Sequence, residues 1–218
     1  MKFRALGFVL ILLAFFPQPT QAAEVTSQAI ATAPGVNIDT SLLLPQKLPA
    51  PAILLAHGFG GSKDSVIAEA KFYQERGYVV MTWTARGFGK STGQITMNST
   101  DAEISDIRLL ISALSKNKSV IQDGSGDPRV GIAGASYGGA AALMTAALDK
   151  RIDAVIADIT WSDMQQALFP QSAVGVTEPG PFKKIWTGTF FALATLQSAY
   201  LGECGALANQ WCAAYKNA

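Results

Sequence analysis

Short apolar runs alternate with helical stretches along most of this 218-residue chain. Residues 52–56 (AILLA) and 78–83 (YVVMTW) are almost entirely apolar, which is typical of strands buried on both faces of a parallel sheet. Further strands are predicted at 129–133 and 152–159. Strands separated by helical segments predict an α/β fold, in which a mostly parallel sheet carries helices on both faces.

Three helices connect these strands. The first begins after Ser62, a typical N-cap residue, and ends before Gly77, a typical helix stop. The second spans residues 101–115, where apolar residues recur at helical spacing. The third is rich in alanine and ends near Leu148.

The two ends of the body depart from this alternation. Residues 25–30 and 36–44 predict an antiparallel hairpin ahead of the first buried strand. After Thr160 the alternation stops, and residues 182–196 are apolar and aromatic without a strand signal. Two interpretations of this segment stay open: a cap or lid helix over an active site, within a cap region at 170–218, and an ordinary core helix.

The first residues have the pattern of a secretory signal peptide. A basic start is followed by an apolar run over residues 5–16, and then by small residues up to Ala22. The run is shorter than the roughly 20 apolar residues that span a bilayer. The sequence therefore predicts a signal peptide at 1–22, a secreted or periplasmic product, and no stable membrane span after cleavage. An uncleaved N-terminal anchor is the alternative.

Composition restricts the remaining function classes. With 49% hydrophobic and 15% charged residues, the chain can bury a sizeable core, and residues 23–218 suit one domain. A net charge of +1 provides no attraction to nucleic acid or to an anionic membrane. No basic cluster interleaved with aromatic residues is present, so nucleic acid is not an expected partner.

Cys204 and Cys212 are the only two cysteines. On one continuous helix they would lie about 12 Å apart, whereas a disulfide needs Cα atoms within about 7 Å. A bridge therefore requires a turn between them, which Gly205 offers, and an oxidising compartment would let it persist. A disulfide and two free thiols both stay open.

The strongest chemical signal is the pattern Gly134-x-Ser136-x-Gly138, between a predicted strand and the alanine-rich helix. G-x-S-x-G forms the nucleophile elbow, a sharp and strained turn that exposes a serine above the sheet and needs small neighbours. The N-terminus of the following helix adds positive potential for a developing oxyanion. The sequence therefore predicts Ser136 as a nucleophile supported by Gly134 and Gly138.

His57-Gly58-Phe59 follows the first buried strand. A turn of this type directs a backbone N–H into the oxyanion hole, and the residue after the nucleophile supplies the second donor. The predicted donors are the backbone N–H groups of Phe59 and Tyr137, while His57 and Gly58 support the loop. A second interpretation makes His57, the chain's single histidine, the general base for Ser136.

The acid of a catalytic triad is less defined. Asp158 stands near the end of the strand that follows the elbow helix, and Asp163 follows in the next loop. Catalytic groups collect at the C-terminal ends of strands in α/β sheets, so Asp158 is the candidate acid. An acid without a histidine to orient has no catalytic task, and a capping or solvated position is the ordinary role of both residues.

Four segments carry a resemblance to a known family: residues 52–62 (AILLAHGFGGS), 78–94 (YVVMTWTARGFGKSTGQ), 127–139 (DPRVGIAGASYGG) and 151–168 (RIDAVIADITWSDMQQAL). Together they resemble the Xaa-Pro dipeptidyl-peptidase-like hydrolases, which have an α/β-hydrolase fold and include cocaine-esterase-like acyl hydrolases. The resemblance implies Ser136 as nucleophile, with the Phe59 and Tyr137 amides as oxyanion donors. It implies neither a metal nor an organic cofactor. Some members use a tyrosine hydroxyl in the oxyanion hole, which Phe59 cannot supply.

The chain departs from this family after the cap region. The family's acid and histidine lie on later strands, and we expect a truncated chain that lacks the last strands of the sheet. The resemblance implies a secreted serine hydrolase that cleaves an ester or peptide bond, including Xaa-Pro bonds, through an acyl-enzyme on Ser136. The alternative is a non-catalytic binding module, or an inactive fragment, that keeps the elbow without its histidine.

Overall fold

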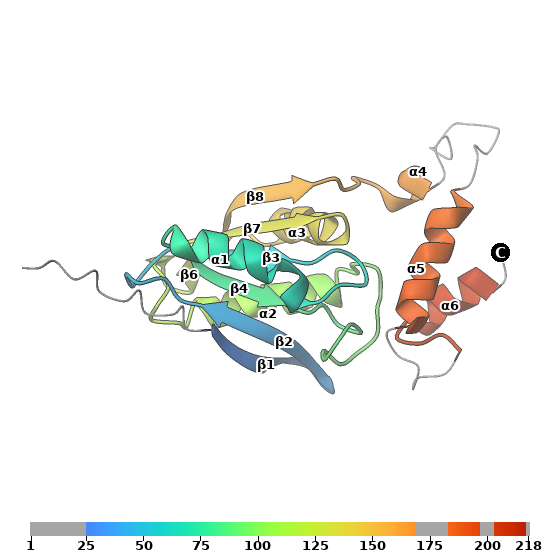
Figure 1. Ribbon diagram of the computed structural model, residues 1–218, viewed down its shortest axis with the longest axis horizontal. Helices are drawn as coiled ribbons and strands as arrows, with labels where there is room; N and C mark the ends of the chain where they lie inside the picture. Colours follow the sequence, from blue (N-terminus) through green and yellow to red (C-terminus); the bar gives the residue numbers. More distant parts are fainter. Residues whose placement is uncertain (1–24, 169–182, 197–202, 217–218) are drawn as a thin grey trace, which may run out of the picture.

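The computed structural model describes residues 25–168, 183–196 and 203–216 (Figure 1). The predicted signal peptide at 1–22 and part of the predicted cap region at 170–218 lie outside these residues. The strands of the main sheet are β1 (Val25–Ala33), β2 (Val36–Leu43), β3 (Ala52–Ala56), β4 (Val79–Trp83), β7 (Val130–Ala135) and β8 (Ile152–Asp158).

The order of strands in this sheet is β1-β2-β4-β3-β7-β8. β2 pairs in antiparallel fashion with β1 and with β4, whereas the β4–β3, β3–β7 and β7–β8 pairs are parallel. The predicted hairpin and the mostly parallel sheet are confirmed. β5 (Gln122–Gly124) and β6 (Asp127–Pro128) form a separate two-stranded sheet in the connection before β7.

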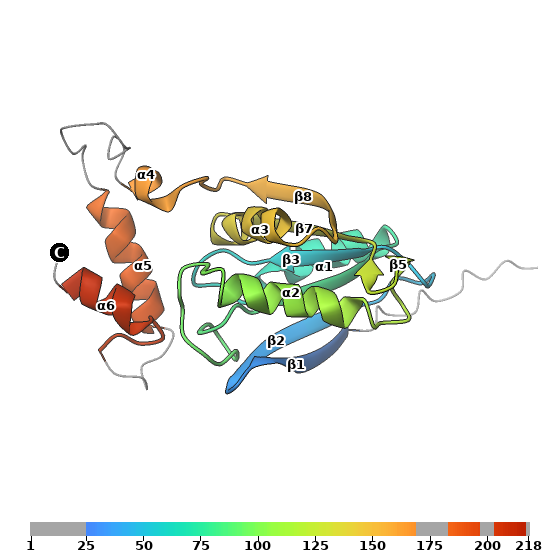
Figure 2. The ribbon, with the colours of Figure 1, turned by 180° about the vertical axis from the view of Figure 1, so that it is seen from behind.

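Helices cover both faces of the sheet, as predicted (Figures 1 and 2). One face carries α1 (Ile67–Glu75), which continues a 3-10 turn, η1 (Lys63–Val66). The other face carries α2 (Glu103–Leu114) and α3 (Tyr137–Leu148). The three helical connections therefore bury the central strands between two layers of helices.

Ser62 and Gly77 bound the first helical segment, where the sequence places its ends. The Ser62 hydroxyl accepts the N–H of Asp64, and the Ser65 hydroxyl in turn accepts the N–H of Ser62, which completes a capping box. Gly77 has φ +92°, a left-handed conformation that ends a helix at no Cβ penalty.

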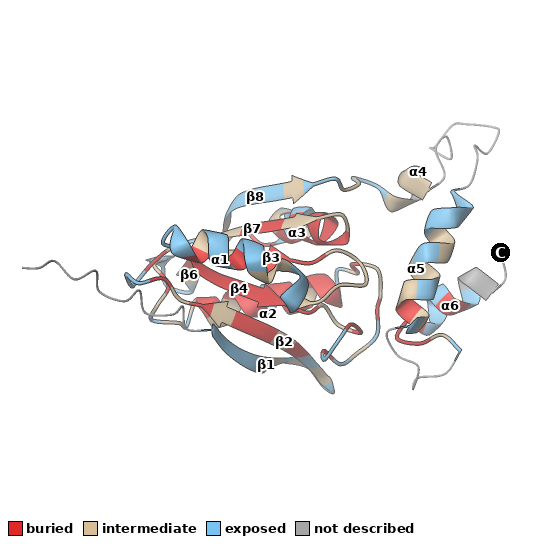
Figure 3. Cartoon of the chain, in the orientation of Figure 1, coloured by how far each residue is buried: buried red, intermediate tan, exposed pale blue. Residues whose placement is uncertain are grey.

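The core has a layer on each face of the sheet, and its buried positions follow the central strands (Figure 3). On the α2 side, Ile104, Ile107 and Leu110 are buried against Leu54 and Ile132 of the sheet. These α2 residues are the ones whose helical spacing predicted the helix. The layer on the α1 side consists of Leu43, Leu55, Ala70, Val80 and Ala133.

β8 forms one edge of the sheet and is exposed along most of its length (Figure 3). Its sequence is mostly apolar, yet Val155 is 39% and Ile156 57% exposed. The reason is topological, because within the described residues β8 pairs with β7 alone. An apolar strand sequence thus predicts a strand here but does not predict how deeply it is buried.

The C-terminal part comprises α4 (Met164–Leu168), α5 (Lys184–Leu196) and α6 (Asn209–Lys216), which lie beyond the end of the sheet where β8 finishes (Figure 1). The segment before α6 joins the body through main-chain bonds to Ile95. The Ile95 N–H donates to the Ala206 carbonyl at 2.7 Å, and the Ala208 N–H donates to the Ile95 carbonyl at 3.0 Å. None of the helices in the described part of the chain has the length and apolar character to span a bilayer.

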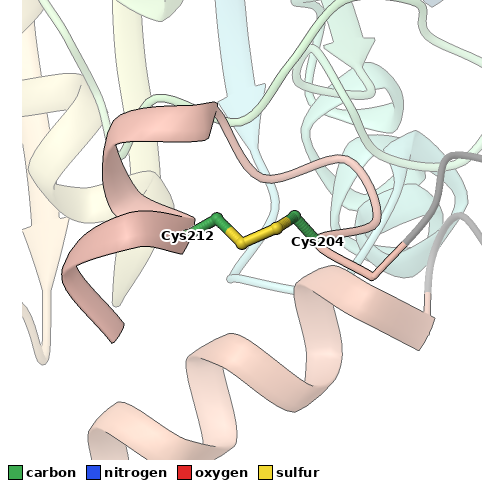
Figure 4. The surroundings of a disulfide bond; sticks show 2 residues. All are labelled: Cys204 and Cys212. Carbon is green, nitrogen blue, oxygen red and sulfur yellow. A yellow bond between two sulfur atoms is a disulfide. The ribbon is translucent and has the colours of Figure 1, made fainter. Parts of the chain in front are cut away.

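Cys204 and Cys212 form a disulfide (Figure 4), which decides between the two alternatives that the sequence leaves open. Their Cα atoms lie 5.6 Å apart. Gly205 has φ +53° and provides the turn between them. Cys204 thus precedes α6 instead of lying on it, and the 12 Å separation of a continuous helix does not apply.

Candidate active site

Ser136 occupies the turn between β7 and α3 with φ 54° and ψ −119°. A non-glycine residue with positive φ is strained, and such strain is common at functional sites. Three hydrogen bonds hold the turn. The Ser136 N–H donates to the Asp158 carbonyl at 3.0 Å, and the Ser136 carbonyl accepts from the Ala140 N–H at 3.0 Å and from the Thr160 hydroxyl at 2.7 Å.

The glycines on either side of Ser136 are required by close packing. A Cβ on Gly134 would lie 2.6 Å from the main chain of Gly138. A Cβ on Gly138 would lie 2.7 Å from the His57 carbonyl oxygen and 2.9 Å from that of Ala56. The start of α3 therefore touches the end of β3 directly, and this contact brings the His57 loop beside the elbow.

His57 is buried, and both of its ring nitrogens bond to the main chain. Nε2 accepts the N–H of Ala85 at 2.9 Å, and Nδ1 lies 2.7 Å from the Gly58 carbonyl oxygen. Because Nε2 is an acceptor, the proton is on Nδ1, which donates to Gly58. The ring therefore links its own loop to the segment after β4, and neither nitrogen is free to accept a proton from Ser136.

Burial lowers the pKa of His57 below its ordinary value, although the Gly58 bond acts in the opposite direction. In the unfolded chain His57 takes up a proton near pH 6.5, whereas in the folded chain it stays neutral to a lower pH. We therefore expect the contribution of neutral His57 to the free energy of unfolding to be fully present above about pH 6.5. Below it, stability falls by up to about 1.4 kcal/mol per pH unit until the folded pKa is reached.

Thermal melting between pH 8 and pH 5 measures this loss. No other histidine titrates in that window, because the chain has only one. A His57→Gln variant is expected to melt with a flatter pH dependence, whatever its absolute stability. An unchanged slope in that variant would assign the acid sensitivity to other groups.

Phe59 lies beside the elbow through its aromatic ring. The ring is in edge-on contact with Tyr137, at a centroid distance of 5.2 Å, and with Phe88, at 5.0 Å. The loop itself closes through a bond from the Gly61 N–H to the Gly58 carbonyl at 3.0 Å. The two residues that the sequence predicts as oxyanion donors are thus neighbours, although their sequence positions are far apart.

α5 lies against the same loop. A Cβ on Gly60 would lie 3.3 Å from Leu193, and the ring of Phe190 is 5.0 Å from that of Phe59. Trp161, from the loop after β8, contacts Phe190 at a centroid distance of 6.3 Å. Phe191 of α5 also packs against the core cluster that contains Tyr137, and Ala194 is the one fully buried residue of this helix.

The acidic candidates lie at the same end of the sheet but differ in role. Asp158 ends β8 and holds the elbow through its main-chain carbonyl, while the residue itself is exposed. Asp163 accepts the N–H of Gln166 at 2.9 Å and so caps α4. The structure brings neither carboxylate to a ring nitrogen of His57, whose hydrogen-bond partners are main-chain groups. Across the described ranges, no three His, Cys, Asp or Glu side chains gather as ligands of a metal ion.

Two polar residues at the elbow, Asn98 and Glu103, are not predicted as site residues from the sequence. The Asn98 amide donates to the Tyr137 carbonyl, and Glu103 accepts the Tyr137 hydroxyl. Thr100-x-x-Glu103 has the form of a capping box, which marks Glu103 only as the start of a helix. The contact with Tyr137, 34 positions along the chain, has no local sequence signal.

Comparison with known proteins assigns this chain to a family. The model of the X-Pro dipeptidyl-peptidase (S15) family matches residues 34–214. The chain is 30% identical over 118 residues to the polyketide transferase grgF of Penicillium sp, a match that covers 53% of this chain and 38% of the relative.

Two solved structures are similar in fold. A hypothetical protein of Pseudomonas aeruginosa, PA2218, has a TM-score of 0.60 at 22% identity, over 80% of this chain and 54% of that one. The α/β hydrolase GrgF from Penicillium sp. sh18 has a TM-score of 0.56 at 20% identity, over 89% and 64%. The fold is therefore that of the α/β hydrolases. The chain spans 38% of the length of curated relatives such as the polyketide transferase.

Proposed function

The chain belongs to the X-Pro dipeptidyl-peptidase (S15) family, and on that basis we propose that it is a serine hydrolase with Ser136 as its nucleophile. The reaction would cleave an ester or peptide bond of a small-molecule substrate through an acyl-enzyme on the Ser136 hydroxyl. An Xaa-Pro peptide is one such substrate. The name of the relative grgF, a polyketide transferase, does not single out a peptide bond, so the proposal includes both substrate classes.

One observation carries this proposal: the left-handed backbone of Ser136 between two glycines that no larger residue can replace. A strained serine at the strand-to-helix turn is the geometry that presents a nucleophile above an α/β sheet. The α3 N-terminus behind it favours negative charge at the reacting centre. The Phe59 and Tyr137 backbone amides are proposed as the donors to that charge, and α5 as a cap over the loop.

Among the described residues, no general base is positioned to accept the proton of the Ser136 hydroxyl. His57 uses both ring nitrogens for main-chain bonds, and Asp158 has no histidine to orient. The binding-module alternative is therefore the second candidate function, since it needs the elbow and no base. A serine without a positioned base still gains from its oxyanion donors and from substrate binding, which leave about 10³–10⁴-fold acceleration over water in a known triad enzyme.

The test is covalent labelling of Ser136 by a fluorophosphonate probe, with and without added imidazole. A dissolved base replaces one that the site does not position, so we expect imidazole to raise the labelling rate about tenfold or more. Ser136→Ala is expected to abolish labelling, whereas Ser112→Ala on α2 is expected to leave it unchanged. A folded chain that stays unlabelled in imidazole would count against the nucleophile and favour the binding module.

Export from the cytoplasm is a separate proposal, which rests on the pattern of residues 1–22. The disulfide between Cys204 and Cys212 supports it, since such bonds persist mainly in oxidising compartments. N-terminal sequencing of the expressed protein checks it. A mature chain that begins at Ala23 is expected, and a retained Met1 in the exported fraction would contradict cleavage.

A further inference from the structure

A buried polar cluster lies directly beneath the elbow, and the proposed reaction does not use it. It consists of Asn98, Glu103 and the Tyr137 hydroxyl, together with the main chain of Thr96 and Ser99. Asn98 and Glu103 are each 3% exposed. Polar groups buried at this depth ordinarily have hydrogen bonds that compensate for the loss of water.

Glu103 accepts four hydrogen bonds, three from the loop before α2 and one from Tyr137. Its Oε1 accepts the Thr96 N–H at 2.6 Å and the Tyr137 hydroxyl at 3.2 Å. Its Oε2 accepts the Ser99 N–H at 3.2 Å and the Thr96 hydroxyl. Glu103 is the first residue of α2, where the helix dipole favours a negative charge. A buried carboxylate thereby becomes a fixed anchor for the Tyr137 side chain.

Asn98 binds the main-chain carbonyl of Tyr137, although its own backbone conformation and its amide oxygen are unfavourably placed. Its Nδ2 donates to the Tyr137 carbonyl at 3.0 Å. Its backbone is left-handed, with φ 63°, and so is that of Met97, with φ 57°. In the described part of the chain, Oδ1 of Asn98 is buried without a hydrogen-bond partner. A residue kept in a strained and incompletely bonded state is a candidate for a functional role.

We propose that Asn98 and Glu103 are positioning residues that fix Tyr137 from both ends and thereby aim its backbone N–H at the oxyanion. The inference rests on the proposed function of Ser136. Asn98 holds the main-chain carbonyl of Tyr137 and Glu103 holds its side-chain hydroxyl, so both parts of the residue are restrained. A rigid donor needs no reorganisation when charge develops on the substrate. A displacement of an ångström at such a donor costs up to about a hundredfold in rate.

The phenol is suited to this task because it stays protonated. Burial, followed by the negative charge of Glu103, raises the pKa of Tyr137 well above its ordinary value. The hydroxyl therefore remains a hydrogen-bond donor over the whole working range of pH. Replacing Tyr137 by phenylalanine removes this one bond and leaves the ring contacts with Phe59 and Phe88 in place.

The experiment compares Tyr137→Phe, Asn98→Gly and Glu103→Gln with the parent chain. Glycine is used at Asn98 because it accepts positive φ without strain. The first readout is amide hydrogen exchange of the peptide that spans residues 134–141, which contains the Ser136 and Ala140 N–H bonds of the elbow. We expect exchange about tenfold faster in Tyr137→Phe and Asn98→Gly, and also faster in Glu103→Gln, because its amide nitrogen cannot accept the two hydrogen bonds that one carboxylate oxygen accepts.

The second readout is fluorophosphonate labelling in imidazole, resolved into the maximal rate and the half-saturating probe concentration. At a temperature where all variants are folded, we expect the maximal rate to fall about tenfold or more in Tyr137→Phe, with the half-saturating concentration unchanged. A structural role alone would lower the melting temperature and leave the maximal rate unaltered. Tyr73→Phe, on α1, is the matched control and is expected to change neither readout.

The two readouts separate the two proposals. If the parent chain is not labelled, the serine mechanism is wrong, and hydrogen exchange still decides whether Asn98 and Glu103 hold the elbow. If the parent is labelled and Tyr137→Phe reacts at the same maximal rate, the positioning role is overturned. Unchanged exchange over residues 134–141 in both Tyr137→Phe and Asn98→Gly would also overturn it.

Discussion

Replacing Gly138 by alanine is expected to destabilise the fold by about 3 kcal/mol and to suppress labelling of Ser136. In a helix such as α3 this substitution ordinarily stabilises by about 1 kcal/mol, because glycine is a poor helix former. Here the added Cβ would lie 2.7 Å from the His57 carbonyl oxygen and 2.9 Å from that of Ala56. Main-chain oxygens at the end of a buried strand cannot move aside, so the collision outweighs the gain in helix propensity.

Gly188→Ala is the matched control, since Gly188 lies within α5 and its Cβ would meet nothing within 4 Å. This variant is expected to be as stable as the parent or up to about 1 kcal/mol more stable. Denaturant unfolding of both variants measures the difference. Equal stabilities for Gly138→Ala and Gly188→Ala would show that α3 and β3 are not as tightly apposed as the structure has them.

Asp106→Asn is expected to cost about 3–5 kcal/mol, because it removes the carboxylate that is paired with the buried guanidinium of Arg86. The two side chains form a bidentate pair, Nε to Oδ2 and an Nη to Oδ1, each at 2.7 Å. They are 12% and 4% exposed. Burial acts to lower the pKa of Arg86, but the bonds and the charge of Asp106 outweigh it and raise that pKa overall. The pair ties the segment after β4 to α2, and Asn98 lies between them in the chain.

Two comparisons make this prediction specific. Asp123→Asn, which breaks the exposed pair with Arg129, is expected to leave the unfolding midpoint unchanged. A double variant, Arg86→Met with Asp106→Leu, is expected to recover most of the loss, because it removes both buried charges. Denaturant unfolding is the measurement for all three. A midpoint for Asp106→Asn equal to that of Asp123→Asn would mean that water reaches Arg86.

The sequence predicts the elements and the elbow because their signals are local. Residues 52–56 and 78–83 are apolar runs, and the chain places β3 and β4 there. Apolar spacing within 101–115 predicts α2, and its buried face is the predicted one. The glycines around Ser136 predict a strained turn, and its φ is 54°. In each case the residues that determine the structure are neighbours in the chain.

Other features depend on contacts between segments far apart in the chain, which a single sequence does not reveal. The mostly apolar sequence of β8 is compatible with a buried strand, but the strand order within the described residues places it at the edge of the sheet. The two alternatives for His57 separate only when the Ala85 N–H, 28 positions away, is found on Nε2. The disulfide between Cys204 and Cys212 depends on where α6 begins.

The support of the elbow is the clearest case of this difference. Ser136 follows from five consecutive residues, whereas Asn98 and Glu103 reach Tyr137 across 39 and 34 positions. Local patterns determine backbone conformation, because torsional strain and alternating burial act between neighbouring residues. Hydrogen bonds of buried side chains are decided by which segments the sheet brings together, and only the tertiary structure determines that.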